Sequence, residues 1–464
     1  MTTRPRLVLA VENLVREFDA KLLLACAAAE RGFECVLGSR TRVDFLAGRF
    51  APSIYFSKSM TSKSELVFRL LRMLRSAIVV QDEECLAYYS REHYQAARLS
   101  PKTLPLAAAL FAWGEDSAEL LRTYPAYAGA PLHRTGSPRI DLLRPELRGF
   151  FAEDVARIRQ RHGRFVLINS SFAMVNGFFD SFNILREPLS LSYGKSPRLG
   201  AAAHGASADF AVGYARHRTA LFDAFKRMLR PLSEQFPDVT FVLRPHPSER
   251  HEPWRAATHG LANVRVVHEG NVVPWLLAAD ALIHNGCTTA VEGAVIGVPL
   301  ITYAPVKSEL YEAHLPDGLS YEARDLTALF DLLKRALDSG PERGEPIGGA
   351  KQLMDRHLAS LTGPLAVDRI VAVLEGIELP RSGASAGVRE LTARAVVLGR
   401  AFSKQHIKAR NPEHTHNPAY QSHRFPGLAI EDVRTRIERM GRTLGRFEGV
   451  RAELLAEHVF RIAR

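Results

Sequence analysis

Short runs of aliphatic and β-branched residues alternate with longer helical patterns along most of the 464-residue chain. The run at residues 7–11 (LVLAV) precedes a helical pattern over 19–31, which ends at Gly32, and a second apolar run at 33–37. Strands separated by helices predict βαβ units and a parallel sheet. Further runs follow at 76–80, 110–113, 165–169, 240–243, 264–267, 281–284 and 300–303.

A stretch without clear periodicity divides this series. Residues 183–213 are rich in Ser, Gly, Ala and Pro, which predicts an irregular excursion. A Ser/Gly/Ala linker at 381–387 precedes a polar segment, and residues from 430 onward are expected to be helical. We therefore expect an α/β fold with two Rossmann-like domains facing a cleft, at 1–213 and 214–376, and a basic helical C-terminal extension at 377–464 that packs back on the N-terminal domain.

The charge of the chain favours anionic partners. The net charge is +11, from 61 basic and 50 acidic residues, and residues 376–464 alone hold 16 Lys+Arg against 9 Asp+Glu. An anionic membrane surface fits this excess, because each basic residue near anionic lipid contributes about 1 kcal/mol. Nucleic acid is not expected, since no recognition motif accompanies the arginines. No apolar run reaches the roughly 18 residues that span a bilayer.

Metal sites, disulfides and export signals are not expected from the sequence. The start of the chain shows no signal-peptide pattern, so we expect a cytoplasmic protein, peripheral at the inner membrane. The cysteines have no CxxC spacing, and the late histidines match no pattern of metal ligands. These residues are Cys26, Cys35, Cys85 and Cys287, and His406, His414, His416, His423 and His458.

The run at 240–243 ends at the sequence RPHP, from Arg244 to Pro247. Proline has no N–H to give to a sheet, so the strand stops here and the backbone presents His246 in one direction. An imidazole beside a guanidinium makes a pair that binds anions. This sequence therefore predicts a phosphate site.

A second motif, HNGCTTAVEG, follows the run at 281–284. Asn285 and Gly286 predict a turn, and a helix is expected to begin near Thr288. The free N–H groups of that helix and the hydroxyls of Thr288 and Thr289 would face a ligand, and Glu292 would reach ribose hydroxyls. A capped helix without a ligand explains this motif equally well alone. Its place one βα step after the RPHP sequence favours function.

These two motifs resemble the nucleotide half of GT-B glycosyltransferases that use cytidine nucleotides. Bacterial sialyltransferases and the polyol-phosphate polymerases of teichoic acid synthesis share both. The resemblance implies that His246, with Pro247, and the threonine pair hold the phosphate. It also implies that Glu292, or the loop Glu269-Gly-Asn271, contacts the nucleoside.

The rest of the chain resembles bacterial surface-carbohydrate biosynthesis proteins and the retaining β-Kdo transferases that use CMP-Kdo. The resemblance covers nearly the whole chain. It implies transfer of Kdo or a related ulosonic acid from a CMP-sugar to a lipid-linked or oligosaccharide acceptor of lipopolysaccharide O-antigen or capsule synthesis. The stretches that carry it are VENLVREFDAKLLLA, GFECVLGS, IVVQDEECLAYYS, TGSPRIDLLRPE, FVLINSSF and HRFPGL.

Catalysis at a sugar needs a carboxylate. Asp82, Glu83 and Glu84 directly follow the run at 76–80, and three adjacent acids are expected to raise one another's pKa. One of them would serve as base or nucleophile, and at least one would cap the next helix. If the resemblance holds, retaining transfer passes through a covalent glycosyl-carboxylate. Glu12 and Glu17 are secondary candidates.

Polar residues at other strand ends complete the candidate site. Arg16, Asn169 and Asn176 are expected on the acceptor side, and Asp141 is expected to be a structural cap. No metal or other cofactor is expected, because helix N-termini and basic side chains already meet the charge of the leaving group. The alternatives are a CDP-polyol phosphotransferase of teichoic-acid type, a non-catalytic nucleotide-binding scaffold, and a nucleotide-sugar 2-epimerase.

Overall fold

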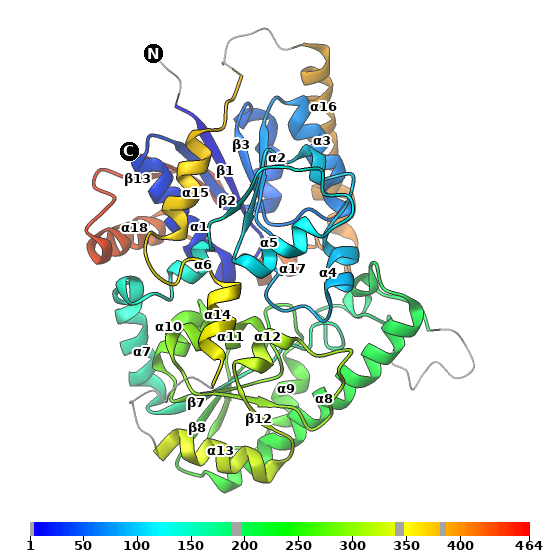
Figure 1. Ribbon diagram of the computed structural model, residues 1–464, viewed down its shortest axis with the longest axis vertical. Coiled ribbons are helices and arrows are strands. Elements are labelled where there is room, and N and C mark those ends of the chain that lie inside the picture. Colours follow the sequence, from blue (N-terminus) through cyan, green and yellow to red (C-terminus); the bar gives the residue numbers. More distant parts are fainter. Residues whose placement is uncertain (1–3, 188–196, 339–347, 381–386) are drawn as a thin grey trace. The chain divides into compact units, whose positions relative to one another are not determined.

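The computed structural model describes residues 4–187, 197–338, 348–380 and 387–464 (Figure 1). They form two compact α/β units, each built on one β-sheet. The chain passes between the units several times. Unit 1 comprises Met1–Cys85, Arg98–Phe150 and Asp355–Arg464, and unit 2 comprises Leu86–Ala97 and Phe151–Met354.

The sheet of unit 1 has eight strands in the order β13-β14-β2-β1-β3-β4-β5-β6. The six strands from β2 to β6 in this order are parallel, and the central ones are apolar runs buried on both faces, as parallel sheets require. They are β1 (Arg6–Val11), β2 (Glu34–Ser39), β3 (Ile54–Ser57), β4 (Ala77–Val80), β5 (Ala109–Ala112) and β6 (Leu132–Arg134).

The helices of unit 1 come from both ends of the chain. Helix α1 is almost entirely buried, because α15 and α18 of the C-terminal part pack against it. The helices are α1 (Leu14–Glu30), α2 (Arg40–Phe50), α3 (Glu65–Met73), α5 (Glu115–Arg122), α6 (Pro138–Asp141), α15 (Ala366–Glu375), α16 (Val388–Phe402), α17 (Pro418–Arg424) and α18 (Ile430–Leu444), and α14 (Ala350–His357) contains a unit boundary.

The C-terminal extension packs back on unit 1, as expected, but it does not end as a helix. Strands β13 (Arg451–Ala456) and β14 (Val459–Ala463) form a hairpin, and β14 pairs antiparallel with β2. Gly38 of β2 permits this approach, because a Cβ there would lie 2.3 Å from the carbonyl oxygen of His458. The expectation of helix from residue 430 to the end is therefore wrong after α18. Residues 381–386 of the predicted linker lie outside the described part of the chain.

The sheet of unit 2 has six parallel strands in the order β12-β11-β10-β7-β8-β9. Strand β7 pairs with both β8 and β10, so it lies in the middle of this sheet. The domain boundary expected at 213 is therefore corrected to the region before helix α7. The strands are β7 (Phe165–Asn169), β8 (Thr240–Arg244), β9 (Val264–Val266), β10 (Ala281–His284), β11 (Leu300–Tyr303) and β12 (Tyr321–Ala323).

Unit 2 has its own core, in which aromatic residues of α8 pack on the sheet. Phe222 and Phe225 of that helix contact Phe172 and Trp254. The last part of the excursion expected at 183–213 is helical, because α8 already begins at Ala208. The helices are α4 (Arg91–Arg98), α7 (Ala152–His162), α8 (Ala208–Gln235), α9 (Glu252–Ala257), α10 (Val272–Ala278), α11 (Thr288–Ile296), α12 (His314–Gly318) and α13 (Leu326–Asp338).

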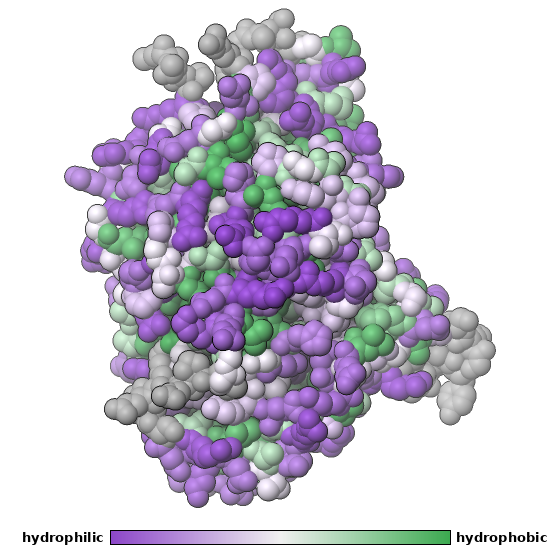
Figure 2. All heavy atoms as spheres, viewed as in Figure 1, coloured by the Kyte–Doolittle hydropathy of each residue, from purple (hydrophilic) through white to green (hydrophobic). Residues whose placement is uncertain are grey.

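The surface in view is mainly hydrophilic, with apolar side chains scattered between the polar ones (Figure 2). No helix in the described part of the chain is long and apolar enough to cross a membrane.

Candidate functional site

The carboxyl ends of β7, β8 and β10 place polar side chains at one edge of the unit 2 sheet. In the strand register Asn169 of β7 lies beside Arg244 of β8, and the strand β10 runs alongside β7 to His284. Ligands of open parallel sheets bind beyond this edge. The residues predicted from the RPHP sequence and from the HNGCTT motif therefore lie on one side of one sheet.

Arg244 holds a loop rather than pointing freely at the edge. Its guanidinium donates to the carbonyl oxygens of Glu269 and Gly270 at 2.6 and 3.0 Å, and it lies 4.8 Å from the centre of the Trp275 ring. Burial lowers the pKa of Arg244 to about 9, and the charge of Glu269 offsets only part of this shift. These contacts make Arg244 a positioning residue for the loop after β9, and its direct contact with phosphate stays a prediction.

Glu269 itself lies on the surface. Its carboxylate pairs with the Arg161 guanidinium at 3.0 Å, while its backbone carbonyl accepts from Arg244 and from the Trp275 indole at 3.1 Å. The loop predicted to contact the nucleoside is thus fixed by its backbone. The nucleoside contact of Glu269 stays a prediction.

His246 presents a defined face of its imidazole. Its Nδ1 accepts the backbone N–H of Ser248 at 3.1 Å, which assigns the proton of the neutral ring to Nε2. His246 is half-buried, and Pro245 and Pro247, which flank it in the sequence, restrict the backbone on either side of it. An Nε2–H that is held in this way is suited to donate to a phosphate oxygen.

Glu249, which the sequence analysis did not single out, organises this edge. Its buried carboxylate accepts from the Ser170 hydroxyl at 2.9 Å, the Phe172 N–H at 2.6 Å and the Trp254 indole at 2.9 Å. It also accepts from the Asn176 amide at 3.4 Å. Burial raises the pKa of Glu249, although these four donors act in the opposite direction. The carboxylate joins the loop after β7 to the loop after β8.

Asn169 and Asn176 therefore belong to unit 2, which corrects their assignment to an acceptor-side domain. The cause is the position of β7, which pairs with the strands that carry the nucleotide motifs. Asn176 is buried and also donates to the carbonyl of Arg250 at 3.0 Å, so its contacts support the loop.

The turn after β10 has the structure that its sequence predicts. Gly286 adopts a left-handed conformation at φ +78°, and α11 begins at Thr288. Buried His284 supports the turn, because its Nδ1 accepts the Gly286 N–H at 3.0 Å and its Nε2 lies 2.7 Å from the Ser320 hydroxyl. Burial lowers the pKa of His284 to about 3, so this imidazole is neutral.

Thr288 and Thr289 form the first turn of α11 and are half-buried, while Glu292 lies one turn further and is buried. The N–H group of Ala290 in this turn donates to the Cys287 carbonyl oxygen at 3.0 Å, and the binding of an anion at the turn stays a prediction. Asp317 of α12 lies beside the turn, where a Cβ on Gly286 would be 3.5 Å from its carboxylate. Burial raises the pKa of Asp317 to about 6, against a hydrogen bond from the Thr302 hydroxyl at 2.9 Å.

Two amide oxygens at this edge lack a partner. Asn169 Oδ1 and Asn285 Oδ1 are buried and accept no hydrogen bond within the described chain. Arg218 of α8, which the sequence analysis also missed, donates to the carbonyl oxygens of Ser171 and Asn285 and lies 5.0 Å from the Phe172 ring. Because a buried acceptor without a partner costs about 1–3 kcal/mol, the two amides are suited to a ligand that brings donors.

The predicted catalytic carboxylates lie at the carboxyl edge of the unit 1 sheet, in a network of ion pairs. Glu12 pairs with Lys58, with Arg424 at 2.9 Å and with Arg40 at 3.7 Å. Burial alone would raise the pKa of Glu12, but these three cations hold it well below its usual range. Lys58 also pairs with Glu17 at 3.2 Å, which joins the two secondary candidates.

The three adjacent acids have separate partners. Asp82 receives two hydrogen bonds from Arg98 at 2.9 and 3.1 Å and accepts the Glu84 N–H at 2.8 Å, so it has a structural role. Glu83 pairs with Lys21 at 3.3 Å. Glu84 pairs with Arg16 at 3.2 Å, and its side chain is 43% exposed, against 4% for Asp82 and 11% for Glu83.

The expectation that these acids raise one another's pKa is wrong for Glu84. Burial acts to raise its pKa, but the charges of Arg16, Arg98 and Lys58 lower it to about 2. Glu84 is therefore ionised at neutral pH, which suits a nucleophile or base and not an acid. Arg16, predicted on the acceptor side, is its ion-pair partner.

Asp141 is a structural cap, as expected, but it caps a helix distant in sequence. Its buried carboxylate accepts the N–H groups of Ala366 and Val367 at 2.8 and 3.0 Å, at the start of α15. No group of three or more possible metal ligands gathers within the described ranges. The absence of a metal from the reaction stays a prediction.

No model of a known protein family matches the chain, and no curated protein sequence matches it. The fold is similar to that of the wall teichoic acid polymerase TagF soaked with CDPG, at a TM-score of 0.50, 11% identity and coverage of 80% of this chain and 88% of TagF. The chain has a GT-B type fold. UDP-GlcNAc 2-epimerase from Neisseria meningitidis bound to UDP-GlcNAc is similar at a TM-score of 0.49 and 14% identity, with 80% of this chain and 100% of the epimerase covered. HepE from Anabaena in complex with UDP-glucose is similar at a TM-score of 0.41 and 12% identity, with 80% of this chain and 100% of HepE covered.

Proposed function

We propose that the chain is a glycosyltransferase of surface polysaccharide synthesis that binds a nucleotide-sugar donor at the carboxyl edge of unit 2. The observation that carries this proposal is the pair of buried, unpartnered amide oxygens of Asn169 and Asn285, which lie at the same edge of the sheet as the strand end that carries His246. A nucleotide brings hydroxyl and amino donors for the amides and a phosphate for the imidazole. The GT-B type fold is consistent with such a donor.

The donor that we propose is CMP-Kdo or a related CMP-ulosonic acid. The support is the resemblance of the RPHP and HNGCTT motifs to those of enzymes that use cytidine nucleotides. In this proposal His246 and the first turn of α11, with Thr288 and Thr289, hold the phosphate of CMP. Glu292 lies one turn further along α11, where we propose that it receives a ribose hydroxyl.

For the transfer itself we propose Glu84 as the nucleophile. It is the most exposed of the four predicted carboxylates, and Arg16 keeps it ionised. Its carboxylate attacks the anomeric carbon while the bond to the CMP phosphate oxygen breaks. An acceptor hydroxyl then attacks the same carbon, loses its proton to solvent and displaces the Glu84 carboxylate, so the configuration is retained. The acceptor is a lipid-linked or oligosaccharide glycan, and the protein acts at the periphery of the inner membrane.

Thermal unfolding of the full chain with CMP, CDP, UMP and UDP tests the donor site. We expect CMP to raise Tm more than UMP does. In Asn285→Ala the rise in Tm caused by CMP should be smaller than in the wild type, while the Tm of the nucleotide-free variant should change less than this. Gln235→Ala, which removes an exposed amide at the end of α8, is the control. Stabilisation by UDP alone would overturn the cytidine donor and favour a nucleotide-sugar 2-epimerase, which product analysis without acceptor detects.

Turnover assays separate transferase from scaffold. Incubation with CMP-Kdo and an oligosaccharide acceptor is expected to release CMP, and Glu84→Gln is expected to stop the release. A CDP-polyol phosphotransferase is the second candidate, because TagF, a wall teichoic acid polymerase, has a similar fold. That reaction attacks phosphorus, so it would survive Glu84→Gln and would consume CDP-glycerol instead. Binding of CMP with no turnover of either donor would leave a nucleotide-binding scaffold.

A further inference from the structure

Helix α16 carries apolar side chains on two opposite faces. Ala393 and Val397 face inward and form a buried cluster with Leu70 and Leu74 of the α3 region. Ala401, one turn beyond Val397, is also buried. This inner face is sufficient to hold the helix on unit 1, so the second apolar face needs another explanation.

The second face is exposed to solvent. Val388 is 81% exposed, Phe402 is 59% exposed, and Leu391 and Leu398 are both 56% exposed. Successive residues of this set are separated by three, seven and four positions, so they lie in one stripe along the helix. Single exposed apolar residues are common, but the outer face of a surface helix is ordinarily polar. A continuous apolar stripe marks an interaction surface.

The segment that carries this stripe is strongly basic. Residues 388–410 contain six Lys or Arg and one acidic residue, Glu390, which pairs with Arg394 at 2.8 Å. Arg389, Arg400 and Lys404 form no ion pair within the described ranges. An exposed apolar residue again stands beside a basic one further along, because Ile407 is 63% exposed and Lys408 follows it. Exposed apolar side chains beside unpaired cations are the pattern of helices that lie in the surface of an anionic membrane.

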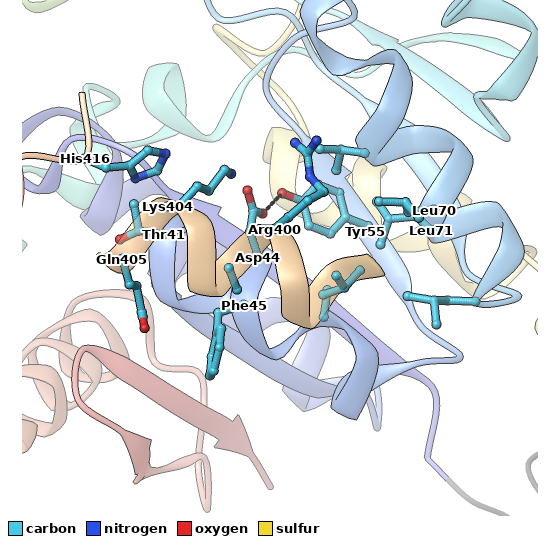
Figure 3. Close-up of a pocket in the computed structure, with 15 residues that line it drawn as sticks. Thr41, Asp44, Phe45, Tyr55, Leu70, Leu71, Arg400, Lys404, Gln405 and His416 are labelled. Carbon is cyan, nitrogen blue, oxygen red and sulfur yellow. Dashed lines mark hydrogen bonds between the residues drawn. The ribbon is translucent and has the colours of Figure 1, made fainter. Parts of the chain in front are cut away.

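A pocket lies under this segment, between α16, α2 and α3 (Figure 3). Arg400, Lys404 and His416 follow one another along one side of it, and Leu70 and Leu71 lie beyond them. The lining of the pocket thus combines the cations Arg400 and Lys404 with apolar side chains, which suits a molecule with an anionic group and a hydrocarbon chain.

The one carboxylate that lines this pocket already has partners. Asp44 accepts the Tyr55 hydroxyl at 2.8 Å and pairs with Arg40 at 3.7 Å. Partial burial lowers the pKa of Lys404; the charge of Asp44 acts in the opposite direction, and the charges of Arg400, Arg40 and Lys408 lower the pKa further. An anion from outside the chain would compensate this excess of positive charge.

We propose that residues 388–410 dock on a bilayer of anionic phospholipid, with the apolar stripe in the acyl boundary and the basic side chains of the segment attracted to the lipid phosphates. The proposed function places the protein at the periphery of the inner membrane, and residues 388–410 are the surface that would contact that membrane. The docking proposal rests on the proposed function only for the position of the acceptor. Association with the membrane would hold the enzyme beside a lipid-linked glycan. Binding to vesicles without any donor tests the surface independently of catalysis.

Co-sedimentation of the full chain with vesicles tests the proposal. We expect binding to vesicles of phosphatidylcholine with phosphatidylglycerol, and little binding to phosphatidylcholine alone. The double variant Arg400→Gln/Lys404→Gln should bind roughly thirtyfold more weakly, because two basic residues are lost. Leu398→Ser/Phe402→Ser should also lose binding. The matched control is Leu454→Ser/Leu455→Ser, which changes two exposed leucines of β13 in the same unit.

Several outcomes would overturn the proposal. One is equal binding of wild type and both α16 variants, and another is binding by the wild type that does not depend on phosphatidylglycerol. Stabilisation by inorganic phosphate without vesicle binding would assign Arg400 and Lys404 to a free phosphate instead. A dimer in light scattering that Leu398→Ser/Phe402→Ser dissolves would assign the stripe to a second copy of the chain. Retained Tm and retained CMP binding in the variants show that the fold and the donor site are intact.

Discussion

The indole Nε1 of Trp254 donates to the buried carboxylate of Glu249 at 2.9 Å, and the same carboxylate accepts from the loop after β7. Glu249 follows the RPHP sequence by two residues, so the strand end that presents His246 is fixed to the neighbouring strand end. The direction of the imidazole is therefore a property of the two loops together. Removal of Glu249 would release both of them.

Glu249→Ala is expected to lower the free energy of unfolding by about 3 kcal/mol, because it leaves several buried donors without an acceptor. Urea unfolding of the two proteins measures the difference. Glu252→Ala changes an exposed glutamate of α9 nearby and should stay within about 0.5 kcal/mol of the wild type. A Glu249→Ala protein as stable as the wild type would contradict the role of the carboxylate.

His246→Ala is expected to weaken CMP binding about 10- to 100-fold, the value of one hydrogen bond to a charged group. His246 is half-buried, and its Nδ1 accepts the Ser248 N–H from two residues along the chain, so we expect stability to change less than CMP binding does. Titration calorimetry with CMP gives the affinity. His259→Ala removes an exposed histidine of the same unit and should bind CMP like the wild type. Equal affinities for the two variants would place the phosphate elsewhere.

The local features of this chain could be predicted from its sequence, and the distant pairings could not. Apolar runs that alternate with helical patterns gave the parallel sheets, and the turn at Gly286 followed from two residues. The first domain boundary was misplaced because β7 pairs with strands more than 70 residues away. The segment 451–463 is rich in helix formers, yet it becomes a hairpin because β14 covers the edge of β2.

In the candidate site, too, local motifs could be predicted from the sequence and contacts between distant residues could not. Short motifs whose own residues are adjacent in the sequence, such as RPHP and HNGCTT, identified the strand ends. Arg218, Glu249 and Lys58 were missed because their partners are far along the chain, as for Arg218 and Asn285, which are 67 residues apart. The ion pairs of Glu84 were missed for the same reason, so the sign of its pKa shift was wrong.

Asp141 is expected to make stability depend on pH between about 4 and 7. Burial raises its pKa to about 7 in the folded chain, although the N–H groups of Ala366 and Val367 favour the charged form. The unfolded chain loses this proton near pH 4, so in this window it binds fewer protons than the folded chain. The free energy of unfolding therefore falls as pH rises, by up to about 1.4 kcal/mol per pH unit. Urea unfolding of Asp141→Asn should lack this part of the slope, and an identical slope in both proteins would contradict the shift.

Glu84 is expected to act in the opposite direction at lower pH. Its folded pKa of about 2 lies below the value near 4.3 of an unfolded glutamate. The stability that its ionised form contributes is present above about pH 4.3 and is lost as pH falls toward 2. The free energy of unfolding of the wild type should therefore fall as pH falls below about 4.3, and urea unfolding followed by circular dichroism measures it. Glu84→Gln should lack this part of the fall, and an equal fall in both proteins would contradict the shift.

The rate of sugar transfer separates Glu84 from its neighbours. Because its pKa is about 2, Glu84 stays ionised over the whole pH range in which the fold is stable, so its titration should produce no acid limb between pH 5 and 8. Glu84→Gln should lower kcat for CMP release about 10³-fold, as expected for loss of a group that acts on the reacting carbon, and it should also lower Tm because its ion pair with Arg16 is lost. Asp82→Asn should lower Tm without this loss of kcat, because it breaks the two hydrogen bonds from Arg98. Glu65→Gln, in an exposed pair with Arg69, is the matched control and should leave both quantities unchanged. A Glu84→Gln enzyme with the wild-type kcat would exclude this carboxylate as the nucleophile.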